Sequence, residues 1–173
     1  MGSDNPIGAD NQQERLGIAE WITGFTDGEG CFSISVVRNS GCRLGWQVQH
    51  EFAITQSAIS VEALEVVRTH MGCGTVVLHR RHDNHKAPLA EYSVKRRRDL
   101  VAVIIPFFEA HPLMTAKRRD FELFKMVIDL VGRHRHLEED GLREIASITQ
   151  SMNRKQRSRY LESSEAIRRP SHR

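Results

Sequence analysis

Apolar and polar residues recur with helical or strand periods along most of this chain, and these periods define the elements we expect. From Arg15 to Thr26 the apolar side chains have helical spacing, which predicts a first helix. Cys31 to Arg38 and Trp46 to Gln56 alternate between apolar and polar residues, a pattern typical of half-buried strands. Asn39-Ser40-Gly41 predicts a turn between them. A helix followed by an antiparallel hairpin is therefore expected.

The same succession recurs further along the chain. Ser60 to Met71 has helical spacing and is followed by Gly72-Cys73-Gly74, which is typical of a helix end. A second strand pair is expected at Thr75 to Arg81 and Glu91 to Lys95, joined by the polar segment His82 to Pro88. Further helical patterns cover Asp99 to Glu109, Thr115 to Val131, Leu137 to Met152 and Tyr160 to Ile167. The expected fold class is α+β.

An antiparallel sheet must bury at least one face, so we expect the helices to cover one face and to leave the other exposed. The side chains that alternate onto the exposed face are mainly hydroxyls, amides and charged groups. Such a curved sheet can enter the major groove of duplex DNA. The candidate DNA-binding residues are Ser33, Ser35, Val37, Asn39, Gln47, Gln49, Glu51, Ala53, Thr75, Val77, His79, Arg81, Glu91, Ser93 and Lys95. The alternative is an ordinary solvated surface.

Ile22 to Gly30 places two carboxylates at the expected end of the first helix. The carbonyl end of a helix is partially negative, so Asp27 and Glu29 are unfavourable there unless a cation compensates them. This pattern predicts a metal. Gly24 and Gly28 lie four residues apart on one helix face, where the absence of side chains lets a second helix approach. The segment therefore predicts two helices in contact beside a metal.

Length and composition favour one intracellular domain. We expect a single domain over residues 14–167 of the 173, a flexible segment at residues 1–13 and a frayed tail at residues 168–173. The apolar runs are too short for a membrane span, and residues 1–13 lack the apolar core of a signal peptide. The 3 cysteines form no close pair, which favours free thiols over disulfides or a zinc site. The expected location is the bacterial cytoplasm or an organelle.

The formal net charge is only +3, but the basic residues are clustered. The clusters lie at Lys95 to Arg98, Lys117 to Arg119 and Arg154 to Arg159. Such clusters are compatible with binding to nucleic acid, although charged runs on helices are also common as solvated faces.

Ile22 to Gly30 resembles the nonapeptide motif of the LAGLIDADG homing endonucleases, and the order of the expected elements resembles their αββαββα fold. Three further segments extend the resemblance: Phe52-Ala53-Ile54-Thr55-Gln56, Pro106-Phe107-Phe108, and Lys117 followed by Phe121. It covers Leu16 to Val131. Because only one nonapeptide is present, the chain is similar to the single-motif type.

The resemblance implies a set of catalytic residues. Glu29 matches the acidic ligand of an essential divalent metal, and the carbonyl of Gly28 matches a further metal contact. Gln56 matches a residue that orders water near the metal, and Lys117 matches the basic residue beside the scissile phosphate. The metal is expected to be Mg²⁺ or Mn²⁺, with Ca²⁺ binding without cleavage. Where some relatives carry another basic residue this chain has Ser60, and Arg118 is a candidate substitute.

The resemblance also implies a homodimer that contacts itself through Thr23, Gly24 and Gly28. The dimer would cut both strands of a long pseudo-palindromic DNA site across the minor groove and leave 3′ overhangs. The alternatives are an RNA-binding intron maturase and a DNA-binding protein without cleavage. RNA recognition usually requires exposed aromatic residues, which the expected outer face lacks.

Two further interpretations remain open from the residues alone. A zinc site or a histidine-based nuclease is one interpretation of His79, His82 and His85 with Asp83 and Asn84, although the flanking pattern of such a site is missing. A loop that contacts DNA is the alternative. Asp27 offers a structural role instead of a catalytic one, because alternation at the end of the helix directs it away from Glu29.

Overall fold

Four antiparallel strands form a single curved sheet in the order β1-β2-β4-β3. The computed structural model describes residues 7–79, 88–152 and 160–161, with side chains from residue 16 onward. The strands are β1 (Gly30–Arg38), β2 (Trp46–Ser57), β3 (Thr75–His79) and β4 (Leu89–Val94). Each of the two hairpins pairs internally, and β2 joins β4. The α+β prediction is confirmed.

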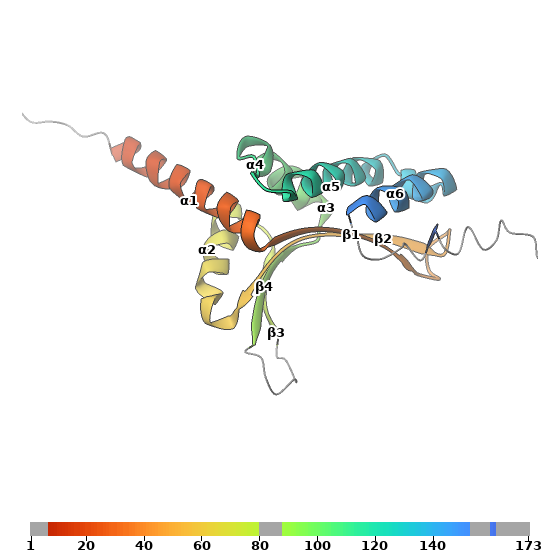
Figure 1. Ribbon diagram of the computed structural model, residues 1–173, viewed down its shortest axis with the longest axis horizontal. Helices are drawn as coiled ribbons and strands as arrows, with labels where there is room; N and C mark the ends of the chain where they lie inside the picture. The colour runs from red at the N-terminus through yellow and green to blue at the C-terminus, as the bar shows by residue number, and fades with distance from the viewer. Residues whose placement is uncertain (1–6, 80–87, 153–159, 162–173) are drawn as a thin grey trace, which may run out of the picture.

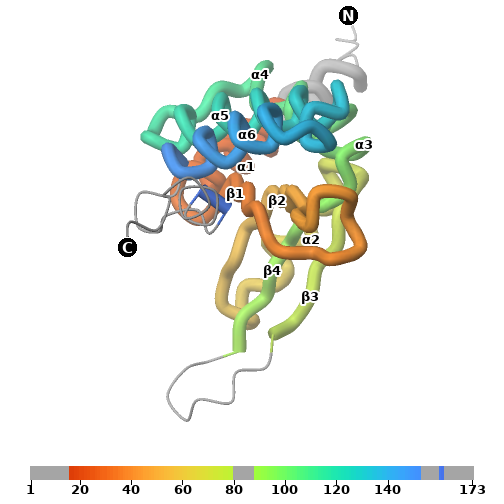
Figure 2. The backbone as a smooth tube through the Cα atoms, turned by 90° about the vertical axis from the view of Figure 1, so that its right-hand side faces the viewer, coloured from red at the N-terminus to blue at the C-terminus, as the bar shows by residue number. Residues whose placement is uncertain are grey.

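The helices lie on one side of this sheet. They are α1 (Ile7–Glu29), α2 (Val61–Met71), α3 (Arg97–Asp99), α4 (Ile105–Ala110), α5 (Lys117–Gly132) and α6 (Glu139–Met152). In Figure 1, α5 and α6 run along β1 and β2, while the start of α1 projects beyond the other elements. Figure 2 shows β3 and β4 extending away from α5 and α6, while α2 packs against these two strands. In Figure 1 no described helix covers the opposite side of the sheet.

Aromatic side chains fill the space between the sheet and the helices. Phe32 of β1 stacks on Phe52 of β2 with 4.9 Å between ring centroids. Phe108 of α4 and Phe124 of α5 lie 5.4 and 5.5 Å from the same Phe32 ring. All four side chains are at most 5% exposed. The predicted alternation along both strands is confirmed, because their apolar residues form this core.

Two helices differ from the sequence pattern. α1 begins at Ile7, upstream of the predicted Arg15, because its polar first turns carry no apolar period; residues 7–13 of the segment expected to be flexible are helical. The single helix predicted at Asp99 to Glu109 contains a π-helical turn, Leu100–Ile104, just before Pro106. Proline has no N–H and cannot continue a regular α-helical ladder, so the backbone changes its hydrogen-bond pattern there.

Some of the predicted segments lie outside the residues that the structure describes. Most of the hairpin tip, Ile167 and the tail at 168–173 lie outside the described residues, whereas Tyr160 and Leu161 are helical as expected. No helix among the described residues combines the length and apolar character needed to cross a bilayer.

Thr26 of α1 offers a test of the packing beneath the helix. Its side chain is 0% exposed, and its Oγ1 has no hydrogen-bond partner within the described residues. A buried hydroxyl without a partner costs roughly 1–3 kcal/mol. We expect Thr26→Val to raise the free energy of unfolding by about 1 kcal/mol in urea denaturation. Thr149→Val is the control, because Thr149 is also buried but its Oγ1 already donates to the Ile145 carbonyl at 2.9 Å, and it should gain no stability. A less stable Thr26→Val protein would contradict the expectation.

Candidate functional site

The carbonyl end of α1 meets the first residue of β1 without a loop. Gly30 makes this possible: a Cβ there would lie 2.5 Å from Thr26 Cγ2 and 2.8 Å from the Thr26 carbonyl oxygen. Only glycine fits so close an approach. The last turn of α1 contains no basic residue. The acidic helix end predicted from the sequence is therefore present, and its compensating charge must come from elsewhere in the fold.

Asp27 binds the segment that leads into α5. Its Oδ2 accepts the Met114 N–H at 2.7 Å, and its Oδ1 accepts the Thr115 N–H at 3.1 Å and the Thr115 hydroxyl at 2.6 Å. Asp27 thereby links the end of α1 to the start of α5, 87 residues away in sequence. These bonds give Asp27 the structural role that was one of its two interpretations.

Lys117 supplies the compensating charge. Its Nζ donates to the carbonyl oxygens of Asp27 at 2.8 Å and of Gly28 at 2.7 Å. The ammonium group thus places a positive charge on two carbonyl oxygens at the partially negative end of the helix. Two residues of the predicted active site, Gly28 and Lys117, are thus in direct contact.

Glu29 differs from Asp27 in having nothing to bind. It is exposed, and no hydrogen bond or ion pair engages its carboxylate within the part of the chain that the structure describes. The Glu29 carboxylate and the carbonyl of the preceding Gly28 are hard oxygen donors, the ligand type that Mg²⁺ prefers. The described residues contain no group of three or more His, Cys, Asp or Glu able to hold a metal. Mg²⁺ tolerates such a sparse protein share, because it keeps waters and binds phosphate oxygens.

Gln56 lies on the other side of the sheet from the open face. It pairs with Ala90, which is 0% exposed, and directly opposed residues point to the same face. Its Oε1 accepts the Ser57 N–H at 3.1 Å. Ser60 is exposed at the start of α2, and Arg118 is exposed in the first turn of α5 beside Lys117. The structure records no contact that joins Gln56, Ser60 or Arg118 to Glu29.

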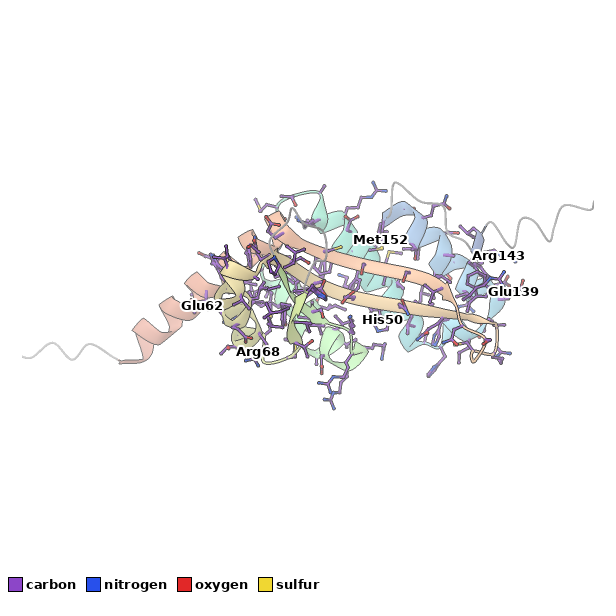
Figure 3. The ribbon with its side chains drawn as sticks, turned by 90° about the horizontal axis from the view of Figure 1, so that it is seen from below. His50, Glu62, Arg68, Glu139, Arg143 and Met152 are labelled. Carbon is purple, nitrogen blue, oxygen red and sulfur yellow. The ribbon has the colours of Figure 1, made fainter. Side chains whose placement is uncertain are left out.

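The open face of the sheet carries the predicted polar rows. Figure 3 looks onto this face of β1 and β2, with α5 and α6 behind them. Opposed pairs along the two strands are Ser33 with Glu51, Ser35 with Gln49, and Val37 with Gln47. The Asn39 amide donates to Gln47 Oε1 at 2.9 Å. A hollow of about 330 Å³ lies over this surface, lined by Ser33, Ser35, Gln47, Val48, Gln49, His50, Glu51 and Lys95.

Acidic groups on this face have basic neighbours. Lys95 Nζ lies 3.0 Å from Glu51 Oε1, and the hydrogen bond to Glu51 raises the pKa of Lys95. His79 Nε2 lies 3.7 Å from Glu91 Oε1. Each pair offers an acceptor and a donor side by side, which is the chemistry that reads base edges in the major groove.

The sequence-based list of face residues needs correction at Ser93. The register places it on the open face between Ala53 and Thr75, but it is only 6% exposed, so the expectation of an accessible side chain is wrong. Its central position between β2 and β3 explains the burial. Val77 is 46% exposed, and Thr75 is exposed as well. Arg81, like His82 and His85 of the zinc alternative, lies outside the described residues.

Strand alternation also identifies two face residues that were left off that list. Cys31 pairs with Ala53, and Thr55 pairs with Glu91. Cys31 is exposed and directly follows the end of the motif. Extending the alternation of each strand by one step toward the helix would have found both.

The carboxylate of Asp27 predicts a pH-dependent contribution to stability. Burial would raise its pKa, but the hydrogen bonds from Thr115 and Met114 and the charge of Lys117 outweigh burial and lower the pKa. Its contribution is therefore complete above the unfolded value of about 3.9 and is lost as the pH falls through the folded value. We expect Asp27→Asn to lower the free energy of unfolding by about 1 kcal/mol at pH 7.

The measurement is urea unfolding of both proteins as a function of pH. The difference between them should be constant from about pH 7 to pH 5 and should shrink below about pH 4. Glu65→Gln, which removes an exposed ion pair with Arg68, is the control and should change stability by only a few tenths of a kcal/mol. A difference that grows on acidification would contradict the assignment.

Comparisons with known proteins agree with these features. The profile of the LAGLIDADG endonuclease family matches residues 22–128. The chain is 36% identical over 140 residues to the probable intron-encoded endonuclease 3 of Neurospora crassa, which covers 80% of this chain and 25% of that protein. It is 34% identical over 119 residues to an uncharacterized 50.9 kDa protein in ND4 intron 1 of Podospora anserina, covering 68% and 25%. The chain thus spans about a quarter of the length of these curated relatives.

The solved structures match this chain over larger shares of their own length than the curated relatives do. The homing endonuclease I-TnaI superimposes with a TM-score of 0.74 at 36% identity, covering 87% of this chain and 97% of that one. I-SmaMI, bound to an uncleaved DNA target in the presence of calcium ions, has a TM-score of 0.76 at 31% identity, covering 90% and 51%. I-LtrWI bound to target DNA has a TM-score of 0.72 at 32% identity, covering 78% and 44%.

Proposed function

This chain belongs to the LAGLIDADG endonuclease family, and from that premise we propose that it is a site-specific, metal-dependent DNA endonuclease that acts as a homodimer. The observation that carries the proposal is the end of α1. There, Glu29 has no partner among the described residues and the Gly28 carbonyl already binds a cationic group, Lys117 Nζ, at 2.7 Å. This helix end leads directly into the first strand of a sheet whose polar face is open.

Hydrolysis of a phosphodiester requires a nucleophilic water, charge compensation on the phosphate and a stabilised leaving oxygen. Glu29 and the Gly28 carbonyl would hold the divalent metal, Mg²⁺ or Mn²⁺, which supplies Lewis acidity and lowers the pKa of water. Gln56 is not a base at neutral pH, but its amide can orient a water. The Lys117 ammonium can offset charge that builds on the scissile phosphate. Ca²⁺ would bind without supporting cleavage.

Duplex DNA is the proposed substrate of the sheet face. The face offers hydroxyl, amide and paired charged groups, and its described side chains include no Phe, Tyr or Trp. Base edges in the major groove match such donors and acceptors, whereas single-stranded RNA is usually bound by aromatic stacking. Relatives bound to their DNA targets support this assignment.

A second copy of the chain is the proposed partner. The described residues contain one motif, and the DNA-bound relatives I-SmaMI and I-LtrWI are about twice the length that this chain matches. Gly24 and Gly28 are exposed, and a Cβ at either would meet nothing within 4 Å of the protomer. Beside them lies an apolar hollow of about 470 Å³ between α1 and α2, lined by Gly17, Ile18, Trp21, Ala63 and Val66.

Two-fold pairing through Thr23, Gly24 and Gly28 would bring two metal sites together. Thr23 is half-buried within its own protomer, so the glycines would make the closest approach. A symmetric protein would then recognise a long pseudo-palindromic site, with one sheet on each half. Cleavage of both strands across the minor groove would leave 3′ overhangs. The names of the relatives place their genes in introns, and we propose the same for this gene and an intracellular site of action, in an organelle or in the bacterial cytoplasm.

Selection from a randomised library of duplexes tests this function. With Mg²⁺, the protein should enrich one long pseudo-palindromic site cut on both strands, and sequencing of the ends should reveal 3′ overhangs. Without a divalent metal no cut ends should be recovered. Uncut DNA together with tight binding to intron RNA would instead identify an intron maturase on this fold. Specific binding to uncut DNA in Mg²⁺ would identify a DNA-binding protein without cleavage.

A further inference from the structure

The cation that α1 needs is delivered by a lysine that the fold holds in place. Lys117 is the first residue of α5, and its Nζ bridges the carbonyls of Asp27 and Gly28. Its side chain is half-buried, unlike a lysine on an open surface. The last turn of α1 contains no basic side chain that could neutralise the two backbone oxygens. The contact is therefore the means by which the protein compensates its own helix end.

Asp27 and Thr115 fix the direction of this contact. The Asp27 carboxylate holds the N–H groups of Met114 and Thr115, and the Thr115 hydroxyl accepts the Lys117 N–H at 3.3 Å. The start of α5 is thereby anchored to the end of α1 by groups other than the Lys117 ammonium. If the ammonium leaves the carbonyls, the two helices remain joined. The Lys117 ammonium can therefore leave the two carbonyls while the end of α1 and the start of α5 keep their positions.

Resting on the proposed function, we propose that Lys117 is the resident cation of the metal site. The Lys117 ammonium binds the Gly28 carbonyl oxygen when no metal is present. A divalent ion that binds this oxygen together with Glu29 would displace the ammonium. Two cations on one carbonyl repel each other strongly at the edge of a protein, where screening is weaker than in water. The released ammonium is then free to approach the scissile phosphate, so metal loading and positioning of the lysine are one event.

Exchange has a measurable consequence for metal affinity. Suppose that the state in which Lys117 binds the Asp27 and Gly28 carbonyls is favoured about tenfold over the state in which it is released. Competition from this bound lysine then weakens the apparent metal affinity by about tenfold. Lys117→Met should therefore bind Ca²⁺ about tenfold more tightly than the unmodified chain does. A role limited to packing would lower stability and leave metal affinity unchanged or reduced.

The experiment uses the full chain with Ca²⁺ and no DNA. Calorimetry measures Ca²⁺ affinity, and acetylation read by mass spectrometry measures the accessibility of each lysine. Lys117 should be protected without metal and should react several-fold faster when Ca²⁺ is bound. Lys125, which pairs with Glu109 and Glu122 through exposed carboxylates, should react equally in both states. Arg118→Met measures the effect of removing a nearby charge without removing the tether.

The outcomes separate this proposal from the one on which it rests. Binding of Ca²⁺ that depends on Glu29 but leaves the Lys117 reaction rate unchanged would overturn the exchange and leave the endonuclease intact. Equal Ca²⁺ affinity in Lys117→Met and the unmodified chain, or equal gains in Lys117→Met and Arg118→Met, would also overturn it. Absence of any Ca²⁺ binding without DNA would overturn the exchange and leave the proposed metal dependence standing, because phosphate oxygens of bound DNA supply the remaining ligands and the cleavage selection tests that dependence separately. Unfolding curves for each variant confirm that the protein remains folded.

Discussion

Glu29→Gln is expected to lower the rate of DNA cleavage by at least about 10³-fold, because a metal contributes several kcal/mol to phosphodiester hydrolysis and each 1.36 kcal/mol is a factor of ten. Glutamine keeps the size of the side chain but removes the charge that makes Glu29 a metal ligand. The substitution should not destabilise the protein, since Glu29 is exposed and its carboxylate binds no described residue.

Single-turnover cleavage of the selected site, with DNA binding measured in Ca²⁺, separates chemistry from recognition. DNA affinity should change little in Glu29→Gln, because Glu29 precedes β1 and is not one of the side chains proposed to contact base edges. Asp129→Asn is the matched control: it removes an exposed carboxylate of α5 that pairs with Arg133 and should cleave at the normal rate. Cleavage by Glu29→Gln within tenfold of the unmodified protein would remove Glu29 from the active site.

The sheet was predictable because its two patterns are local. Alternation in β1 and β2 determined which residues face the core, and Phe32 and Phe52 meet there as the pattern required. Ser93 was not predictable in the same way, since its burial depends on the strands on both of its sides rather than on its own period. The π-helical turn before Pro106 also follows from a local residue, although periodicity alone did not reveal it.

The sequence predicted that the end of α1 needs a compensating cation, but it did not predict which group of the protein contacts that end. Helix electrostatics required a cation near Asp27 and Glu29, and the sequence suggested a metal. In the structure the Gly28 carbonyl accepts a hydrogen bond from Lys117, which lies 89 residues away in sequence. Spacing cannot reveal such a contact, because it depends on how α5 crosses the end of α1. For the same reason the sequence left the role of Asp27 open, whereas its bonds to Met114 and Thr115 decide it.

Gly24→Leu is expected to separate the proposed dimer while making the protomer more stable. A Cβ at Gly24 meets nothing within 4 Å of its own chain, and leucine is a better helix former than glycine by about 0.5–1 kcal/mol. Between two helices, however, leucine prevents close approach, and overpacking costs about 1–3 kcal/mol at each site. Two-fold symmetry counts this cost twice, so the dimer dissociation constant should rise roughly 30-fold to 10⁴-fold.

Sedimentation equilibrium and urea unfolding measure the two opposite effects on one protein. Ala110→Leu adds an exposed leucine on α4, distant in sequence from α1, and should leave the dimer unchanged. Because each protomer supplies one motif, Gly24→Leu should also lose cleavage of both strands, and high protein concentration should restore part of it. A dimer of normal affinity in Gly24→Leu would exclude this face of α1 as the interface. An unmodified chain that is monomeric and still cuts both strands would exclude the dimer itself.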